Sequence, residues 1–390
     1  MQKRLISICL LISFAVIVAC KQEASSDSKP AYPGIERAFG TNLNVANLPD
    51  YEGQSVPNYI SKDNTDGNEI SNEVASLGRV LFYDRKLSVN NQISCSSCHI
   101  QAYAFGDTAQ LSTGINGKTS RHSMRLINAR FSTERSFFWD ERAPSLEEQT
   151  TQPIQDHIEM GYTGEDGDSS LNDLLLKLMA IDYYQELARL AFGDELLTEA
   201  RLQIALAQFV RSIQSFDSKY DAGRQQVNSD LEDFPNFSTE ENQGKFLYMT
   251  ATGSGGAFCS GCHIPPEFDI NQFSRNNGAI GVAGDPDAVD LFNTRSPSLR
   301  DLVNPQGELN GPLMHNGNFK TLLSVVNHYN SIPSENQNPY LDGHLRRGPQ
   351  GTQQLNLSEA NKQALIAFLK TLSGNEVYVN PDYSNPFINP

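Results

Sequence analysis

Two short segments of the sequence carry cysteine and histidine in the same spacing, CxxCH. Their residues are Cys95, Cys98 and His99 in the first segment and Cys259, Cys262 and His263 in the second. On a helical turn the two thiols face the same way, so both can add to the vinyl groups of one haem, and the adjacent histidine supplies the iron's proximal nitrogen. A zinc site would need further ligands close by, and a thioredoxin-like redox pair would need a βαβ setting. Neither setting is present in the sequence, so the motifs predict two c-type haems.

The two motifs lie in a repeated context. Gly78–Phe82 matches Gly244–Tyr248 ahead of the cysteines, and each motif continues as Cys-Ser-x-Cys-His-Ile. Such a repeat indicates duplication of one small helical unit. We therefore predict a mostly α-helical chain with two cytochrome c-like domains, each with one covalently bound haem.

Three helices with apolar residues at helical spacing position these motifs. The first is predicted to start at Ser71, the second at the N-cap Thr198, and the last at Ser358, ending with Gly374 in the C′ position. A polar, broken stretch over 217–238 predicts the domain junction. The predicted divisions are a signal peptide over 1–20, a flexible tether without a core over 21–70, a first cytochrome c-like domain over 71–225, a second over 235–375, and an extended tail over 376–390.

The chain begins with the pattern of an export signal, in which Lys3 and Arg4 precede an apolar run over 5–18. That run is shorter than the ~20 residues that span a bilayer, which argues against a permanent transmembrane anchor. Ala19-Cys20 resembles the lipobox of bacterial lipoproteins, whose cysteine is acylated; ordinary signal cleavage nearby is the alternative. We expect an exported, periplasmic protein held at the membrane only by lipid on Cys20.

The charge balance bears on the kind of partner. The formal net charge is −16 at pH 7, and no Lys/Arg-rich run follows residue 4. No basic surface is therefore available to follow a phosphate backbone. We expect no nucleic-acid partner.

A series of further motifs runs from about Leu77 to Leu372. In order they are LGRVLFYD, the first CxxCH, FFWDERA, EEQ, PIQDHIEMG, the second CxxCH, RSPSLRDL, PLMHNG and AFLKTLSG. In these motifs the chain closely resembles the bacterial di-haem cytochrome c peroxidases, a family that includes the methylamine-utilisation protein MauG. The resemblance implies an N-terminal haem that reacts with peroxide and a C-terminal haem that relays electrons to it.

The resemblance also implies roles for two residues of the first domain. Glu159 matches the family's acid–base carboxylate, which moves a proton between the peroxide oxygens and can have its pKa raised in a dry pocket. Gln149 matches an uncharged amide above the iron that can hydrogen-bond peroxide or water. The alternatives are an exposed loop acid for Glu159 and a helix-surface position for Gln149.

Two further positions match residues near the space between the haems. Trp139, the only tryptophan in the chain, matches an aromatic electron relay, although a lone tryptophan is more often a core residue. His315 matches a histidine near the second haem that acts as a hydrogen-bond donor, with a structural histidine as the alternative. The remaining His157, His328 and His344 receive no predicted role.

The first departure from the classical peroxidases is in the loop LSTGINGKTSR at 111–121, which contains no histidine. Classical members carry a His there that caps the peroxidatic iron. The first haem is therefore expected to be open and high-spin, ligated by His99 alone, as in the MauG branch. His122 stands where the family usually has an Asn that helps bind an interdomain calcium ion. The carbonyls of Asn310 and Pro312 match the remaining sites, but the changed side-chain ligand argues against calcium.

The second departure concerns the sixth ligand of the C-terminal haem, a methionine in classical members. Counting from His315, that position is Tyr329. MauG has a tyrosine there, and a phenolate donor favours the ferric state and lowers the potential. The alternative for Tyr329 is a plain core aromatic. His328 points about 100° away on a helix, and Met314 lies at the wrong distance along the chain.

Three functions are compatible with this pattern. The leading one is a peroxidase that reduces hydrogen peroxide to water with electrons from a small donor protein, either a c-type cytochrome or a cupredoxin. The second is an enzyme like MauG that oxidises a protein or organic substrate through a high-valent state. The third is a non-catalytic di-haem electron-transfer cytochrome, which Gln149 and Glu159 above an open iron oppose. A homodimer is left open.

Overall fold

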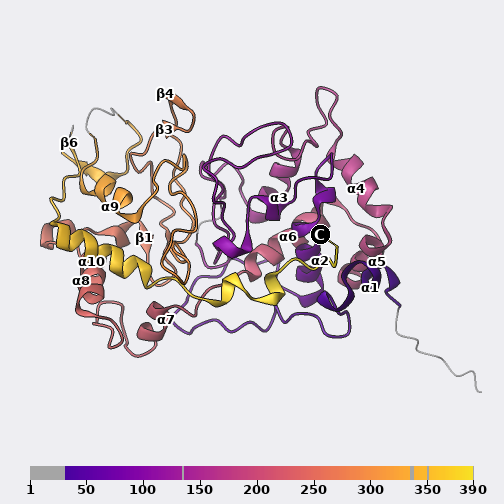
Figure 1. Cartoon of the computed structure of the whole chain (residues 1–390), viewed down its shortest axis with the longest axis horizontal. Coiled ribbons are helices and arrows are strands. Elements are labelled where there is room, and N and C mark those ends of the chain that lie inside the picture. The colour runs from indigo at the N-terminus through magenta and orange to yellow at the C-terminus, as the bar shows by residue number, and fades with distance from the viewer. Residues whose placement is uncertain (1–30, 134–135, 334–337, 349–350, 390) are drawn as a thin grey trace, which may run out of the picture.

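A computed structural model describes residues 31–133, 136–333, 338–348 and 351–389. The predicted signal peptide and Cys20 lie outside this part of the chain. Figure 1 shows two groups of helices side by side, joined by long connections. None of the helices in the described part has the length and apolar character needed to cross a bilayer.

The first group of helices encloses the larger of two main hydrophobic clusters. Its members are α1 (Pro33–Phe39), α2 (Asn72–Tyr83), α3 (Leu146–Gln155), α4 (Leu171–Met179), α5 (Asp182–Phe192) and α6 (Glu199–Ser212). The side chain of Ser71 accepts a hydrogen bond from the backbone N of Val74, and Thr198 caps α6 in the same way through Arg201. Both predicted helix starts are therefore confirmed.

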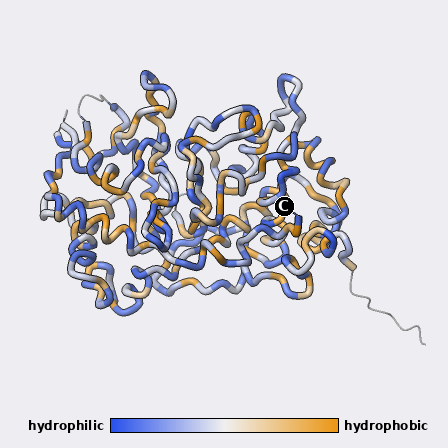
Figure 2. The backbone as a smooth tube through the Cα atoms, in the orientation of Figure 1, coloured by the Kyte–Doolittle hydropathy of each residue, from blue (hydrophilic) through white to orange (hydrophobic). Residues whose placement is uncertain are grey.

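The second group encloses the other main cluster. Its helices are α7 (Lys219–Arg224), α8 (Thr239–Met249), α9 (Leu322–Asn330) and α10 (Glu359–Lys370). Three short antiparallel hairpins accompany them, pairing β1 (His263–Ile264) with β2 (Asp269–Ile270), β3 (Gly281–Val282) with β4 (Asp285–Val289), and β5 (Arg346–Arg347) with β6 (Gly351–Thr352). Figure 2 shows apolar residues in both halves, mixed with polar stretches. The prediction of a mostly α-helical fold is confirmed.

The sequence repeat corresponds to one close helix crossing in each half. A Cβ atom at Gly78 of α2 would lie 1.9 Å from the carbonyl oxygen of Ala205 on α6. A Cβ atom at Gly244 of α8 would lie 1.9 Å from the carbonyl oxygen of Ala364 on α10. Because only glycine permits such backbone contact, the same sequence position has the same structural role twice.

The residue after each of these glycines is a buried cation that binds main-chain oxygens. Arg79, 2% exposed, donates to the carbonyls of Ser384 and Pro381 at 2.7 and 2.8 Å. Lys245, also 2% exposed, donates to the carbonyl of Asp230 at 2.7 Å. A buried charge needs such partners, so each repeat fixes another segment onto its own core, the C-terminal residues in the first half and the loop before α8 in the second.

The prediction of a flexible tether is wrong for the described residues 31–70. This segment contains α1, and its side chains enter the first core at Ile35, Phe39, Leu43 and Tyr51, none more than 2% exposed. The ring of Phe39 packs edge-on against Tyr183 of α5, with 5.4 Å between centroids. Ile35 and Phe39 form only one pair at helical spacing, and Leu43 and Tyr51 stand apart from them, so the segment has no sustained apolar period.

The stretch over 217–238 also differs from the predicted break. It contains α7, and Tyr220, Phe234 and Phe237 pack in the second core, although Tyr220 falls within the first predicted domain. At the other end of this half, α10 starts at the predicted N-cap Ser358 but ends at Lys370, before the predicted stop. The stretch is mostly polar, and its few aromatic residues are separated along the chain. Composition therefore gave no sign that they are buried.

The prediction of an extended tail over 376–390 is wrong for residues 376–389, which pack against the first core. In Figure 1 this yellow segment runs from α10 back across the first group of helices. Val377 and Tyr383 are buried in the first cluster. The hydroxyl groups of Tyr51 and Tyr83 donate to the carbonyls of Asp382 and Tyr383, at 2.5 and 2.6 Å. This segment, here called the C-terminal strap, ties the second half to the first.

Tyr383→Ala should lower the free energy of unfolding by roughly 3 kcal/mol or more, because it removes a fully buried aromatic ring and leaves a cavity. Urea unfolding followed by circular dichroism measures the change. Val379→Ala, at a strap position that is 77% exposed, is the matched control and should change stability by less than about 0.5 kcal/mol. Equal stabilities for the two variants would show that the strap does not contribute to the core.

Candidate functional site

Each CxxCH segment borders a large cavity. The first cavity, about 200 Å³, is lined by Cys95, Cys98 and His99, and the second, about 410 Å³, by Cys259, Cys262 and His263. Protein interiors are close-packed, and voids of this size are not a normal feature of a core. Both cavities therefore fit the enclosure of a bound group.

The four cysteines have the chemistry of buried thiols. Each pair comes from a 3₁₀ turn, Cys95–Ser97 or Cys259–Gly261, and none of the four forms a disulfide. Burial raises the pKa of Cys95 and of Cys259 to about 12, and that of Cys98 and of Cys262 to about 11. Thiols of this kind are poor redox nucleophiles. The setting fits thioether attachment better than a thioredoxin-like exchange pair.

The two histidines are held neutral by burial, as iron ligands must be. The Nδ1 of His99 donates to the carbonyl of Phe105 at 3.1 Å, which leaves Nε2 as the free nitrogen. Burial lowers the pKa of His99, and it lowers the pKa of His263 to about 4. Both residues fit the role of a proximal haem ligand.

A metal ion held by side chains alone is the remaining alternative for these motifs. Among the described residues, one grouping could hold such an ion: Cys262 with Asp342 and His344. It offers one sulfur, one oxygen and one nitrogen rather than the four N/S donors of a structural zinc site. The first motif has no comparable grouping within the described chain. Haem accounts for both motifs, whereas a metal ion held by side chains would account for the second alone.

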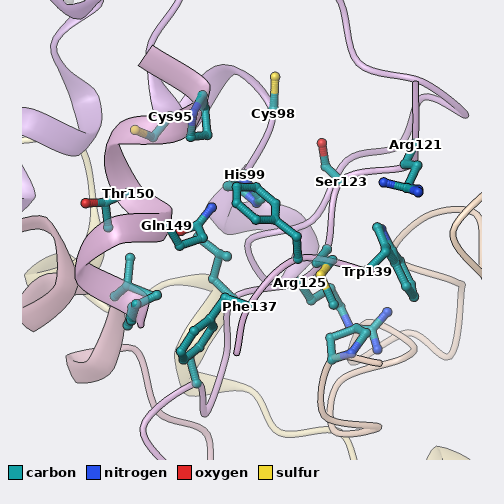
Figure 3. Close-up of a pocket in the computed structure, with 18 of the residues that line it drawn as sticks. Cys95, Cys98, His99, Arg121, Ser123, Arg125, Phe137, Trp139, Gln149 and Thr150 are labelled. Atoms are coloured by element: carbon teal, nitrogen blue, oxygen red, sulfur yellow. The ribbon is translucent and has the colours of Figure 1, made fainter. Parts of the chain in front are cut away.

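The first cavity brings together the residues predicted to act on peroxide. Figure 3 shows Gln149, on α3, in the same pocket as Cys95, Cys98 and His99. Glu159 also lines this cavity, from the loop that follows α3. The side chain of Asp156 accepts a hydrogen bond from the backbone N of Glu159 at 2.9 Å, which fixes the loop.

The carboxyl group of Glu159 has an unusual environment. Burial raises its pKa to about 7; the nearby Asp156 adds to the effect, and Arg142 opposes it. The guanidinium of Arg142 stacks 3.5 Å from the ring centroid of Phe138, and both residues line the same cavity. A carboxyl with this pKa is both a proton donor and a proton acceptor near neutral pH.

The loop at 111–121 supports this arrangement through its backbone. The backbone N of Ile115 donates to the carbonyl of Glu159 at 3.1 Å. A Cβ atom at Gly114 would lie 2.0 Å from the carbonyl oxygen of Ile158, so glycine is required for the contact. This loop lines the first cavity with small and polar residues: Gly114, Thr119, Ser120 and Arg121.

One wall is common to both cavities. It consists of His122, Ser123, Met124, Arg125, Trp139, Arg295, Ser296 and Pro297. The indole Nε1 of Trp139 donates to the carbonyl of His122 at 2.7 Å. The carbonyl of Trp139 accepts from the backbone N of Thr294 and of Arg295, at 2.9 and 3.1 Å. Trp139 is thus fixed between the two halves, at the position predicted for the relay.

His315 lies beside this wall and lines the second cavity. Its ring centroid is 6.3 Å from that of Trp139, and its carbonyl accepts from the backbone N of His122 at 2.6 Å. Burial lowers the pKa of His315 to about 4, and its Nε2 has no hydrogen-bond partner among the described residues. This nitrogen fits a polar group of a ligand in the second cavity.

Tyr329, on α9, also lines the second cavity, and Met314 is its spatial competitor. The side-chain amide of Asn277 donates to both the hydroxyl of Tyr329 and the sulfur of Met314, each at 3.3 Å. Spacing along the chain argues against Met314, but in the structure its sulfur and the phenol share one hydrogen-bond donor and line the same cavity. The Nε2 of His328 lies 2.9 Å from the carbonyl of Asn277, and His328 does not line the cavity.

The side chain of His122 contacts backbone carbonyls of its own half. The Nδ1 atom lies 3.1 Å from the carbonyl of Ala109 and 3.2 Å from that of Gln110. Burial lowers the pKa of His122. Asn310 and Pro312, whose carbonyls match the family's other calcium ligands, lie in the second half.

Comparison with known proteins adds evidence independent of this geometry. The chain matches the family model of di-haem cytochrome c peroxidase over residues 72–228. It is 29% identical over 346 residues to the methylamine utilization protein MauG of Methylophilus methylotrophus, covering 86% of this chain and 92% of that protein. It is 28% identical over 334 residues to the cytochrome c551 peroxidase of Nitrosomonas europaea, covering 82% and 84% of the two chains.

A solved structure is similar in fold as well as in sequence. The crystal structure of a MauG-like protein associated with microbial copper homeostasis aligns with a TM-score of 0.68 and 28% identity, over 86% of this chain and 99% of that chain. Together with the two cavities, these matches show that the chain is similar over most of its length to di-haem cytochrome c peroxidases and MauG proteins.

Proposed function

We propose that this protein reduces hydrogen peroxide to water in the first cavity, with electrons that a small donor protein delivers through the second. The observation that carries the proposal is the placement of Gln149 and Glu159 in one cavity with His99. The haem that Cys95, Cys98 and His99 would hold supplies, when bound, an iron that binds peroxide and accepts electrons. Cys259, Cys262 and His263 would hold the second.

The side chains of the first cavity account for the proton movements. Glu159 takes the proton from one peroxide oxygen and returns it to the other as the O–O bond breaks, which its pKa near 7 allows at neutral pH. The amide of Gln149 orients peroxide or water without adding charge. One peroxide, two electrons and two protons give two waters.

The shared wall accounts for electron movement between the cavities. Trp139 borders both, and its backbone and indole are held from both sides, so we assign it as the relay from the second haem to the first. A c-type cytochrome or a cupredoxin is the expected donor. Export and lipid attachment at Cys20 place the reaction in the periplasm, as the N-terminal sequence indicates.

Steady-state turnover tests the proposal. Purified di-haem protein, mixed with hydrogen peroxide and a reduced small c-type cytochrome or cupredoxin, should oxidise two donor molecules per peroxide without prior reduction of the enzyme. Trp139→Phe should retain both haems and lose most of the donor oxidation. Absence of peroxide-dependent donor oxidation in the fully loaded protein would contradict the proposal.

The pH dependence of the peroxide reaction tests Glu159. Because its base form accepts the first proton, the rate constant should fall as pH falls through about 7. Glu159→Gln should remove this inflection and slow the reaction by about 10²-fold or more. Arg142→Gln removes a charge that lowers the pKa of Glu159, so the inflection should move to higher pH.

Stopped-flow absorbance of the haem measures these rates. Arg130→Gln is the control, because Arg130 pairs with Asp63 at 2.5 Å and does not line the cavity. An unchanged rate in Glu159→Gln would remove Glu159 from the mechanism. An inflection that stays in place in Arg142→Gln would assign it to another group.

A second candidate function is the oxidation of a protein or organic substrate, as the similarity to MauG indicates. The observation that favours it is the placement of Tyr329 in the cavity of the second CxxCH segment. Burial raises the pKa of Tyr329, so the phenol stays protonated unless a cation such as ferric iron takes the oxygen. A phenolate ligand stabilises the oxidised states of iron.

Substitution of the competing ligands separates these candidates. If Tyr329 is the ligand opposite His263, Tyr329→Phe should convert the second haem from low spin to a five-coordinate or water-bound form and raise its potential. Met314→Leu and His328→Ala should leave the low-spin spectrum unchanged. Loss of that spectrum in Met314→Leu, measured by electron paramagnetic resonance, would instead assign Met314 as the ligand.

A further inference from the structure

Arg125 lies in the shared wall and extends from one half of the protein to the other. Its Cγ is 3.0 Å from the position of a Cβ atom at Gly106, directly after Phe105, whose carbonyl orients the ring of His99. Its Nη2 donates to the carbonyl of Ser298 in the second half at 3.0 Å. Figure 3 places Arg125 beside Trp139 and below His99. The guanidinium therefore reaches across the interface next to both cavities.

This guanidinium differs from those of Arg300 and Arg121 because it has no counter-charge in direct contact. Arg300 pairs with Asp221 at 2.8 Å, and Arg121 pairs with Asp140 and Asp290 at 2.7 Å each. No carboxylate of the described chain lies within ion-pair distance of Arg125, and its buried Nε has no hydrogen-bond acceptor there.

The charged groups around Arg125 do not replace the missing counter-charge. The titratable groups that interact with it are Asp301 and Tyr378, both at longer range, and burial is the larger effect, lowering the pKa of Arg125 to about 10. A buried guanidinium with unused donors is costly unless an anion neutralises it. The wall thus presents the Arg125 guanidinium, with an unused Nε donor, next to both cavities.

A planar guanidinium matches a carboxylate, which it binds through two parallel hydrogen bonds. The carboxylates that a haem would bring into either cavity are its propionates. We propose that Arg125 binds a haem propionate in the wall between the two cavities and that its charge raises the reduction potential of the haem it contacts. This inference rests on the two haems of the proposed function, but not on peroxide turnover.

No other wall residue duplicates this role. Burial lowers the pKa of His122 and of His315, so both are neutral at pH 7. Arg295 also lines the wall, but its Nη1 donates to the carbonyl of Ser136 at 2.5 Å and its guanidinium stacks 4.5 Å from the ring centroid of Phe137. Arg125 is therefore the cation whose replacement should affect a propionate.

Spectroelectrochemical titration of the holoprotein tests the proposal, because covalent attachment keeps both haems in place when Arg125 is changed. Arg125→Gln should lower the midpoint potential of one or both haems, and Arg125→Lys should restore most of the difference. A shift confined to the five-coordinate haem assigns the first haem's propionate, a shift confined to the low-spin haem assigns the second's, and a shift of both places the cation between them. Arg130→Gln is the control, because Arg130 pairs with Asp63 and does not line either cavity; it should shift neither potential.

Resonance Raman spectroscopy supplies a second readout if Arg125→Gln does not fold. The propionate-bending bands of the ferric protein should move in Arg125→Lys, because an ammonium group keeps the charge but loses the bidentate geometry. Unchanged potentials in a folded, fully loaded Arg125→Gln protein would overturn the proposal and leave Arg125 with water as its partner. Unchanged propionate bands in Arg125→Lys would overturn it as well. Neither result would bear on whether the enzyme turns over peroxide.

Discussion

The structure depends on the need to enclose two large groups in a chain whose cores would otherwise be close-packed. Each half builds a helix pair in which backbones touch at a glycine, Gly78 against Ala205 and Gly244 against Ala364. These crossings hold one side of each half rigid, while the CxxCH turns border cavities of about 200 and 410 Å³. Close packing is the normal state of a protein interior. Cavities of this size therefore indicate that the chain folds around the groups that fill them.

The two cavities share one wall, so the residues of that wall connect the two sites. Trp139 is fixed by a hydrogen bond to His122 and by two backbone donors from the second half. Arg121 adds ion pairs to Asp140 and Asp290 on either side of the interface. The C-terminal strap also joins the two halves, since it follows α10 and packs on the first core. The separation of the cavities is therefore set by the wall rather than by a flexible linker.

The chemistry was more predictable from the sequence than the packing. The CxxCH spacing, the repeated glycine and the caps at Ser71, Thr198 and Ser358 are local signals, and each has the structural counterpart expected of it. Glu159 and Gln149 were placed by resemblance, and the structure brings both to the cavity of His99. Their roles stay predictions, as does the division into domains at fixed residues.

The segments that were misread contain isolated apolar residues in polar surroundings. Ile35 and Phe39 form a single i, i+4 pair on the short helix α1, and Tyr383 is isolated near the other end, yet each is buried in the first core. Such residues are buried by contacts with segments more than a hundred positions away, which no local pattern records. The same holds for Arg125 and for the approach of Met314 to Tyr329, because both depend on how two halves meet.

The central claim is that each cavity encloses one haem attached to its own CxxCH segment, and intact-protein mass spectrometry tests it most directly. Protein made in a host that attaches c-type haem should carry two haem additions on the mature chain. Cys98→Ala and Cys262→Ala should each lose stable attachment at one site only. A mature chain with a single haem addition, or with none, would contradict the account.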